Sequence, residues 1–260
     1  MNPGRWARKS YGLGGDSETH DSMYVQLTKR TSELSPIGLH WIGERLVACF
    51  VTVSRTPAEL WLDEEALMAD ATLRRRAEFA AGRDAARQAM VALGLRAVGV
   101  GRGAEGEPVF PVGLRGSISH THARAVALIG FATDYRSVGV DMDDARPLGD
   151  AAAAGVTWES EVQRVQRALG LTERAAAQNF AFSAKEAIFK CQFPLTQDAA
   201  LKAHQARLLA AHHQADGEMV VAGWRAARST ALILDLVRVR RVGFEGATLA
   251  IATIPAAAFP

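Results

Sequence analysis

The order of strand-like and helix-like stretches along the sequence predicts an α+β protein. A strand comes first, helices follow and strands return, and helices followed by strands appear again in the second half of the chain. The composition agrees, because an apolar fraction of 48% and a charged fraction of 22% are usual for a globular protein. We therefore expect two similar halves that meet near residue 136, although no direct sequence repeat links them.

Three segments follow from this pattern. Residues 1–30 are polar and glycine-rich without periodicity, so we expect a flexible N-terminal extension. Residues 31–136 would form the N-terminal half and residues 137–260 the C-terminal half.

The sequence also bounds the class of protein. No apolar stretch is long enough for a membrane span, and no signal-peptide core follows the basic residues near the N-terminus, so we expect a cytoplasmic protein. The net charge of +2 is too small to indicate nucleic acid as a partner. The two cysteines, Cys49 and Cys191, match no metal-binding spacing and are expected to be buried thiols.

The elements of the N-terminal half are predicted from apolar runs and their boundaries. Residues 45–54 are rich in apolar and β-branched side chains and indicate a buried strand. Pro57 suits the first turn of a helix over residues 57–69, and the longest helix is expected over residues 71–93. The glycines and prolines of residues 99–113 predict a loop or a short hairpin.

The remaining elements follow the same signals. We expect two neighbouring strands at residues 123–131 and 137–140. Helices are expected over residues 159–169 and 172–191, with Thr172 as a candidate cap and Pro194 as the helix stop. The last strands are expected at residues 206–210, 218–224, 231–239 and 247–254.

The stretch Phe-Ser-Ala-Lys-Glu-Ala-Ile-Phe-Lys at residues 182–190 carries the first candidate site residues. Glu186 and Lys190 are i,i+4 neighbours on a helix, so a carboxylate and an ammonium share one face. This pattern alone also fits a purely structural role, in which Ser183 caps a helix and Lys190 makes a surface ion pair.

Asp141 and Asp143 end the strand predicted at residues 137–140. Side chains at i and i+2 of a strand point to one side, so the two carboxylates would lie together. Taken alone, Asp-Asp-Ala-Arg-Pro is more simply a turn. A third carboxylate from Glu186 would complete an oxygen-rich site suited to Mg²⁺ and substrate phosphates.

Basic and hydroxyl side chains upstream indicate phosphate binding. Arg76, Arg83 and Arg87 recur at helical spacing, which fits either a solvated face or bidentate phosphate binding. Ser119 and His120 belong to the sequence Gly-Ser-Ile-Ser-His, whose hydroxyls, amides and imidazole suit a phosphate or pyrophosphate.

Two other site classes find little support. His120-Thr121-His122 could pair on zinc, but no Cys or carboxylate accompanies it at zinc spacing. No serine lies in a Gly-x-Ser-x-Gly elbow, which counts against a Ser-His-Asp hydrolase.

Three ordered motifs, Gly-Ser-Ile-Ser-His, Val-Gly-Val-Asp-x-Asp and Phe-Ser-Ala-Lys-Glu-Ala-x-x-Lys, resemble those of the 4′-phosphopantetheinyl transferases. The likeness is closest to the branch that includes enterobactin synthase component D and other bacterial activators of siderophore and polyketide synthases. Arg-Arg-Ala-Glu-Phe at 75–79, Gly-Arg at 82–83, Gly-Glu-Pro-Val-Phe-Pro at 106–111 and Pro-Leu-Thr at 194–196 are similar too. The resemblance covers roughly residues 73–196.

The resemblance implies a pseudo-twofold α+β monomer with coenzyme A in the cleft between its halves. Such an enzyme moves the phosphopantetheine group of coenzyme A to a serine of an apo acyl or peptidyl carrier protein and releases 3′,5′-ADP. Metal ions and cations stabilise the charge that develops on the leaving phosphate.

The resemblance also implies roles for individual residues, in this numbering. Metal ligands for Mg²⁺ would be Asp141, Asp143 and Glu186. The nucleotide would be held by Arg75, Arg83, Ser119 and His120, with Lys185 on a phosphate. We expect Glu186 to help deprotonate the carrier serine and Lys190 to stabilise or protonate the leaving group.

Two residues depart from the family pattern. Asp143 stands where the family usually has Glu, and its shorter side chain implies contact with the metal through water, or a preference for Mn²⁺. Glu105 stands in a loop where relatives commonly carry a basic residue, and its charge would repel phosphate.

Two other functions compete with an active transferase. A non-catalytic relative that binds coenzyme A or a carrier protein would fit the changes at Asp143 and Glu105, but the intact Glu186 and Lys190 count against it. A nucleic-acid-binding module on the arginine-rich helix is disfavoured by the near-neutral charge and by the lack of interleaved aromatic residues.

Overall fold

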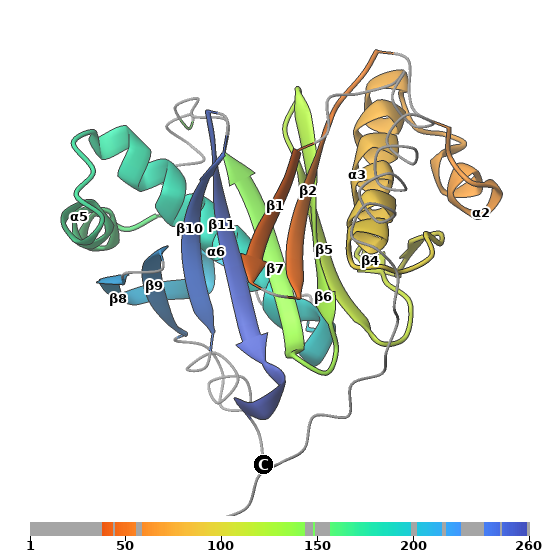
Figure 1. Ribbon diagram of the computed structural model, residues 1–260. Coiled ribbons are helices and arrows are strands. Elements are labelled where there is room, and N and C mark those ends of the chain that lie inside the picture. The colour runs from red at the N-terminus through yellow and green to blue at the C-terminus, as the bar shows by residue number, and fades with distance from the viewer. Residues whose placement is uncertain are drawn as a thin grey trace, which may run out of the picture. The chain divides into compact units, whose positions relative to one another are not determined.

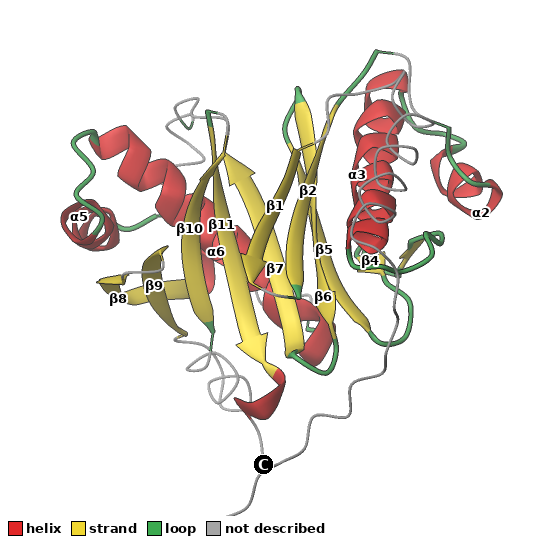
Figure 2. Ribbon diagram, viewed as in Figure 1, coloured by secondary structure: helices red, strands yellow, loops and turns green. Residues whose placement is uncertain are grey.

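The structure is a computed structural model. It describes residues 38–43, 45–55, 59–143, 148, 157–198, 202–214, 217–224, 237–244 and 246–258. The extension expected at residues 1–30 lies outside the described residues. The fold is α+β, as the sequence predicts (Figure 2).

The first large sheet comes from the N-terminal part of the chain. Its strands are β1 (Gly38–Gly43), β2 (Leu46–Thr52), β5 (Leu114–His120) and β6 (Arg124–Phe131). They pair in the order β1-β2-β6-β5, and each described pair is antiparallel. β2 and β6 are the central strands and are apolar along nearly their whole length, because both of their faces are covered.

The second large sheet comes from the C-terminal part. Its strands are β7 (Tyr135–Asp143), β8 (Ala206–Gln214), β9 (Gly217–Trp224), β10 (Arg238–Phe244) and β11 (Ala247–Pro255). They pair antiparallel in the order β7-β11-β10-β9-β8. A separate hairpin joins β3 (Gly101–Arg102) and β4 (Pro108–Val109), which confirms the predicted short hairpin.

One long helix packs on the outer face of each large sheet (Figure 1). α3 (Leu73–Ala92) packs on the first sheet, preceded by α2 (Leu62–Glu65) and a 3-10 turn (Ala66–Met68). α6 (Arg174–Thr196) packs on the second sheet, together with α5 (Glu159–Ala168). No helix among the described residues combines the length and the apolar character that a membrane crossing needs.

The inner faces of the two sheets meet in a shared apolar core. Residues of β2 and β6 pack there against residues of β7 and β11. Burial of this much apolar surface favours the folded state by roughly 25 cal/mol per Å² removed from water. The core members that are shielded almost completely are Leu46, Ala48, Val126, Leu128, Val138, Val140, Leu249 and Ile251.

Several predicted elements are confirmed and a few boundaries differ. β2, β6, α3, α5 and α6 lie where the sequence predicts strands and helices, and both cysteines are buried free thiols. The strand expected at residues 231–239 begins at Arg238, and residues 231–236 lie outside the described residues. The first helix begins at Leu62 rather than at Pro57, which lies outside the described residues.

Three expectations were wrong. β6 and β7 follow one another in sequence but belong to different sheets, because the chain crosses between the two layers at this turn. α6 begins after Glu173 rather than after Thr172. It also continues through Pro194 to Thr196, because a proline in the last turn of a helix removes only one backbone hydrogen bond.

A glycine sets the close approach of α6 to β7. A Cβ atom placed on Gly139 would lie 2.0 Å from the carbonyl oxygen of Ala187 and 2.7 Å from the amide nitrogen of Cys191. Ser137 of the same strand donates a hydrogen bond to the Cys191 carbonyl oxygen at 2.5 Å. Residue 139 must therefore lack a side chain for the helix to lie this close to the strand.

A buried carboxylate joins α2 to α3 and to the loop before β3. Glu64 is fully buried and accepts hydrogen bonds from the backbone N–H groups of Trp61, at 3.2 Å, and Val100, at 3.1 Å. The Arg87 guanidinium of α3 lies 2.7 Å from the same carboxylate.

The C-terminal part repeats this arrangement. Glu161 is buried and accepts from the backbone N–H groups of Trp158, at 3.3 Å, and Leu208, at 3.1 Å, while the Lys185 ammonium of α6 lies 2.7 Å away. Both parts therefore contain Trp-x-x-Glu at a short helix, with the glutamate bound to a cation on the long helix. A duplicated unit would share such a feature.

Candidate active site

Serine side chains join the two large sheets where β5 approaches β7. Ser117 Oγ accepts a hydrogen bond from the backbone N–H of Val140 at 3.0 Å, and Ser119 Oγ accepts from that of Met142 at 3.4 Å. Ser119 also donates to Asp141 Oδ1 at 2.8 Å. The hydroxyl of Ser119 therefore fixes the orientation of the Asp141 carboxylate as well as the sheet junction.

Lys190 of α6 reaches the same carboxylate. Its Nζ lies 2.8 Å from Asp141 Oδ1 and 3.2 Å from the carbonyl oxygen of Val140. Both charged side chains keep some exposure to solvent, 28% for Lys190 and 13% for Asp141. An ammonium is thus held at the end of β7 and remains accessible to a ligand.

Glu186 lies one helical turn before Lys190. Burial raises the pKa of Glu186; the Lys190 charge lowers it, and the Asp141 charge raises it again. Glu186 is therefore a carboxylate with increased basicity, close to Asp141 and Lys190. Asp143, at the end of β7, accepts a hydrogen bond from the Asn179 side chain at 3.3 Å.

A cavity of about 280 Å³ lies beside this cluster and has cationic walls. Arg75 NH1 lies 2.7 Å from Nε2 of His120. Burial lowers the pKa of His120, and the positive charges of Arg75 and Lys190 lower it further, against the opposing effects of Glu78 and Asp141. Six of the predicted site residues line this cavity: Arg75, Arg83, Ser119, His120, Asp141 and Lys190.

Arg83 lines the cavity, but its guanidinium is hydrogen-bonded to the protein backbone. Its guanidinium donates to the carbonyl oxygens of Val100 at 2.9 Å and Gly101 at 3.0 Å, and it stacks 4.1 Å from the Phe79 ring centre. Burial lowers the pKa of Arg83 to about 10, with the Arg75, Arg87 and Arg102 charges also lowering it and Glu64 opposing them. Of the arginine stripe, Arg83 and Arg87 are therefore buried in the protein rather than solvated.

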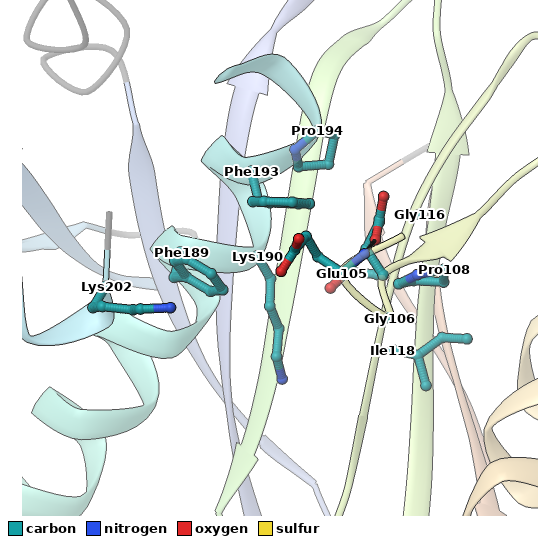
Figure 3. A pocket seen from close by; sticks show the side chains of 12 residues that line it. Glu105, Gly106, Pro108, Gly116, Ile118, Phe189, Lys190, Phe193, Pro194 and Lys202 are labelled. Carbon is teal, nitrogen blue, oxygen red and sulfur yellow. Dashed lines mark hydrogen bonds between the residues drawn. The ribbon is translucent and has the colours of Figure 1, made fainter. Parts of the chain in front are cut away.

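A second cavity of about 410 Å³ lies on the other side of Lys190. Figure 3 shows the α6 side chains of Phe189, Lys190 and Phe193 facing Glu105 and its loop across this cavity. Its walls are mostly apolar, and Gly106, Pro108, Ile118 and Lys190 line both cavities. The two cavities are therefore adjacent, with Lys190 between them.

The structure does not bring Lys185 to this cluster. Its side chain is fully buried, and its ammonium lies 2.7 Å from Glu161. Lys185 and Lys190 are about 140° apart around the helix, since each residue turns it by about 100°. Lys185 therefore faces the protein interior and not either cavity.

Sequence reasoning missed several residues of the site. Glu78, Arg102 and Lys202 line the cavities, and Asn179 binds Asp143. Glu78 lies four residues after Arg74 and three after Arg75, a helical spacing that pairs charges and is the signal that was available. Lys202 and Asn179 have no such local signal.

The carboxylates suit a hard divalent cation only in part. The charge of Asp141 raises the pKa of Glu186, and a cation between the two carboxylates would relieve their repulsion. Asp143 does not complete a cluster with them: no three His, Cys, Asp or Glu side chains of the described residues are grouped for metal binding. The donor pair Asp141 and Glu186 therefore fits Mg²⁺ chemically, and the third ligand is not in place.

Comparison with known proteins finds similarity to one family. The 4′-phosphopantetheinyl transferase N-terminal domain matches residues 63–130, which include α3 and the Ser119–His120 wall of the cationic cavity. The chain is 32% identical over 134 residues to 4′-phosphopantetheinyl transferase Npt of Nocardia iowensis, covering 51% of this chain and 59% of that protein. Over this part, the chain is therefore similar to the 4′-phosphopantetheinyl transferases.

Other relatives agree. The chain is 36% identical over 140 residues to 4′-phosphopantetheinyl transferase PptT of Mycobacterium tuberculosis, covering 52% of this chain and 60% of PptT. It is 36% identical over 132 residues to enterobactin synthase component D of Salmonella typhi, covering 50% of this chain and 54% of that protein. The chain thus spans somewhat more than half the length of these members of the superfamily.

Proposed function

We propose that this chain is a 4′-phosphopantetheinyl transferase that moves the phosphopantetheine group of coenzyme A to a serine of an apo carrier protein. The observation that carries the proposal is the meeting of Asp141, Glu186 and Lys190 beside a cavity with cationic walls. The relatives whose names state this activity support it.

The two cavities suit the two ends of coenzyme A. The cavity lined by Arg75, Arg102 and His120 matches the charge of the nucleotide phosphates. The adjacent cavity, with Phe189 and Phe193, matches the neutral and partly apolar pantetheine arm. Lys190 lines both and would then lie at the pyrophosphate, where the reaction takes place.

The proposed reaction forms one bond and breaks one. The carrier serine oxygen attacks the phosphorus that bears pantetheine, and the bond from that phosphorus to the bridging oxygen breaks, so that 3′,5′-ADP leaves. Glu186 takes the serine proton, directly or through water; its increased basicity suits this role. Lys190 stabilises the negative charge that moves to the leaving phosphate.

The metal requirement is also part of the proposal. Asp141 and Glu186 would hold Mg²⁺, with Asp143 contacting it through water, and the ion would neutralise charge on the pyrophosphate. Mn²⁺ would suit the same oxygen ligands. Arg83 would form part of the cavity wall rather than bind a phosphate directly, because its guanidinium already donates to backbone carbonyl oxygens.

The proposed enzyme works as a monomer in the cytoplasm. Both cavities are lined by residues of one chain, so a second copy is not required to complete the site. Two buried free thiols suit a reducing compartment.

Intact-mass analysis of an apo carrier protein tests the reaction. Incubation with this protein, coenzyme A and Mg²⁺ should add one phosphopantetheine group, and Glu186→Gln or removal of the metal should prevent the addition. Coenzyme A binding without any mass gain, over acyl and peptidyl carriers, would indicate a non-catalytic relative. Absence of both binding and transfer would refute the proposal.

A further inference from the structure

Four side chains converge on the carboxylate of Glu78 in α3. Arg74 Nε lies 3.1 Å from its Oε1 and Arg75 NH1 3.6 Å from its Oε2. The Nδ1 atoms of His120 and His122 lie 3.7 Å and 3.8 Å from the same carboxylate. The four come from two elements, α3 and the end of β5 with the turn after it, so Glu78 links the helix to that strand end.

The carboxylate lies beneath the groups that surround it. The Glu78 side chain is 9% exposed, whereas those of Arg75 and His120 are 48% and 33% exposed. Burial would raise the pKa of Glu78, but the hydrogen bond from Arg74 and the charges of His120, Arg74 and Arg75 outweigh it, and the pKa is lowered. Glu78 is therefore an anion beneath a layer of cationic groups.

This arrangement holds a guanidinium against an imidazole. Arg75 NH1 and Nε2 of His120 are 2.7 Å apart, and both residues line the cationic cavity. A guanidinium only donates hydrogen bonds, so Nε2 accepts this one as part of a neutral imidazole, in keeping with the lowered pKa of His120. The Glu78 carboxylate lies within 4 Å of both side chains and attracts the guanidinium and the Nδ1 side of the ring to the same place.

We propose that Glu78 is a positioning residue for anion binding: it holds Arg75 and His120 at the cavity wall in the geometry that receives the coenzyme A phosphates. The inference rests on the proposed function, and it concerns how the site is kept in place before substrate arrives. Glu78 itself contributes a negative charge and would not bind phosphate. Its effect is exerted through Arg75 and His120.

The substitution Glu78→Gln removes the charge and keeps the shape. We expect KM for coenzyme A, and its Kd measured by calorimetry without carrier protein, to rise about 10- to 100-fold, the range for loss of one charge-assisted hydrogen bond. The kcat should change less than about threefold, because Asp141, Glu186 and Lys190 are unaffected. Glu78→Asp keeps the charge and should recover part of the affinity.

Glu65→Gln is the matched control. Glu65 pairs with Arg76 at 3.0 Å, so this variant also removes a carboxylate bound to an arginine of α3, but neither residue lines either of the two cavities described above. Its KM should equal that of the unmodified protein. If circular dichroism shows that Glu78→Gln does not fold, Glu78→Asp is compared with Glu65→Gln instead. Its KM for coenzyme A should still exceed that of Glu65→Gln.

The NMR titration of His120 distinguishes a positioning role of Glu78 from a purely structural one. His120 faces Glu78 and Arg75 of α3, Lys190 of α6 and Asp141 of β7. Its imidazole NMR titration should move to lower pH in Glu78→Gln, because an attractive negative charge is lost, and should not move in Glu65→Gln.

The outcomes are distinct. Unchanged KM and Kd in Glu78→Gln and Glu78→Asp, or a loss confined to kcat, would overturn the assignment of Glu78. If the unmodified protein neither binds coenzyme A nor transfers its phosphopantetheine, the proposed function fails instead.

Discussion

The ammonium of Lys185 lies 2.7 Å from Oε2 of Glu161, and no part of the Lys185 side chain is exposed. Five residues further along the same helix, Lys190 is partly exposed and lies 2.8 Å from Asp141. Two lysines of one sequence motif therefore have different environments, one inside the fold and one at the candidate active site.

This difference predicts opposite effects of two substitutions. Lys185→Ala should lower the free energy of unfolding by about 3–5 kcal/mol, because it leaves the Glu161 charge buried without its partner. Lys190→Ala should lower it by less, because Lys190 and Asp141 both keep some contact with water, which weakens their attraction. It should nevertheless greatly reduce phosphopantetheine transfer. Urea unfolding and intact-mass assays of both variants measure this; equal stability losses would contradict it.

The pH dependence of transfer should report Glu186. The proposed base acts when it is deprotonated, so the rate should rise with pH as Glu186 loses its proton. Burial raises the pKa of Glu186, whereas bound Mg²⁺ would lower it, so the rise should move to lower pH as the Mg²⁺ concentration increases. Glu186→Gln should lower kcat about 10²- to 10⁴-fold and abolish that limb of the pH–rate profile. A limb that persists in the variant would assign the proton transfer to another group.

The two cysteine thiols should be inert in the folded protein. Burial raises the pKa of Cys49 and of Cys191 to about 12; the charge of Asp84 adds to the effect at Cys49, and a hydrogen bond with Ser137 opposes it at Cys191. Iodoacetamide at pH 8 should leave both unmodified and should alkylate both in guanidinium, because the thiolate is the reactive form. Mass spectrometry gives the count; alkylation in the native protein would show that the sites open.

Local patterns predicted the long elements well and the site geometry in part. α3 and β2 have strong apolar runs, and both lie where the sequence predicts them. The sequence predicts no strand over β5, which contains Gly116, Ser117 and Ser119. They are tolerated because the two hydroxyls bind the backbone of β7, a contact between distant segments that no local pattern contains.

The roles of the charged residues show the same limit. Helical spacing placed Glu186 and Lys190 on one face, but it could not show that Lys185 faces Glu161, which lies 24 positions earlier. Arg83 likewise has the spacing of a phosphate ligand, yet its guanidinium binds the carbonyl oxygens of Val100 and Gly101. Whether a charged side chain is bound inside the fold or faces the cavity depends on tertiary packing, which the local sequence does not show.

Substitution of Gly139 should test whether the packing of α6 on β7 sets up the site. A Cβ atom there would meet the Ala187 carbonyl oxygen at 2.0 Å, so Gly139→Ala must move the helix or the strand. We expect a loss of about 1–3 kcal/mol in unfolding free energy, typical of overpacking. Transfer activity should fall further than stability explains, because Glu186 and Lys190 move with α6 relative to Asp141.

Gly243→Ala is the control for this substitution. Gly243 also lies in a strand of the second sheet, but a Cβ atom there would meet nothing within 4 Å. Its stability and activity should stay near those of the unmodified protein. Activity should be measured at a temperature where both variants are fully folded by circular dichroism, so that a loss reflects geometry rather than unfolding. Full activity in folded Gly139→Ala would show that catalysis does not require this close approach of helix and strand.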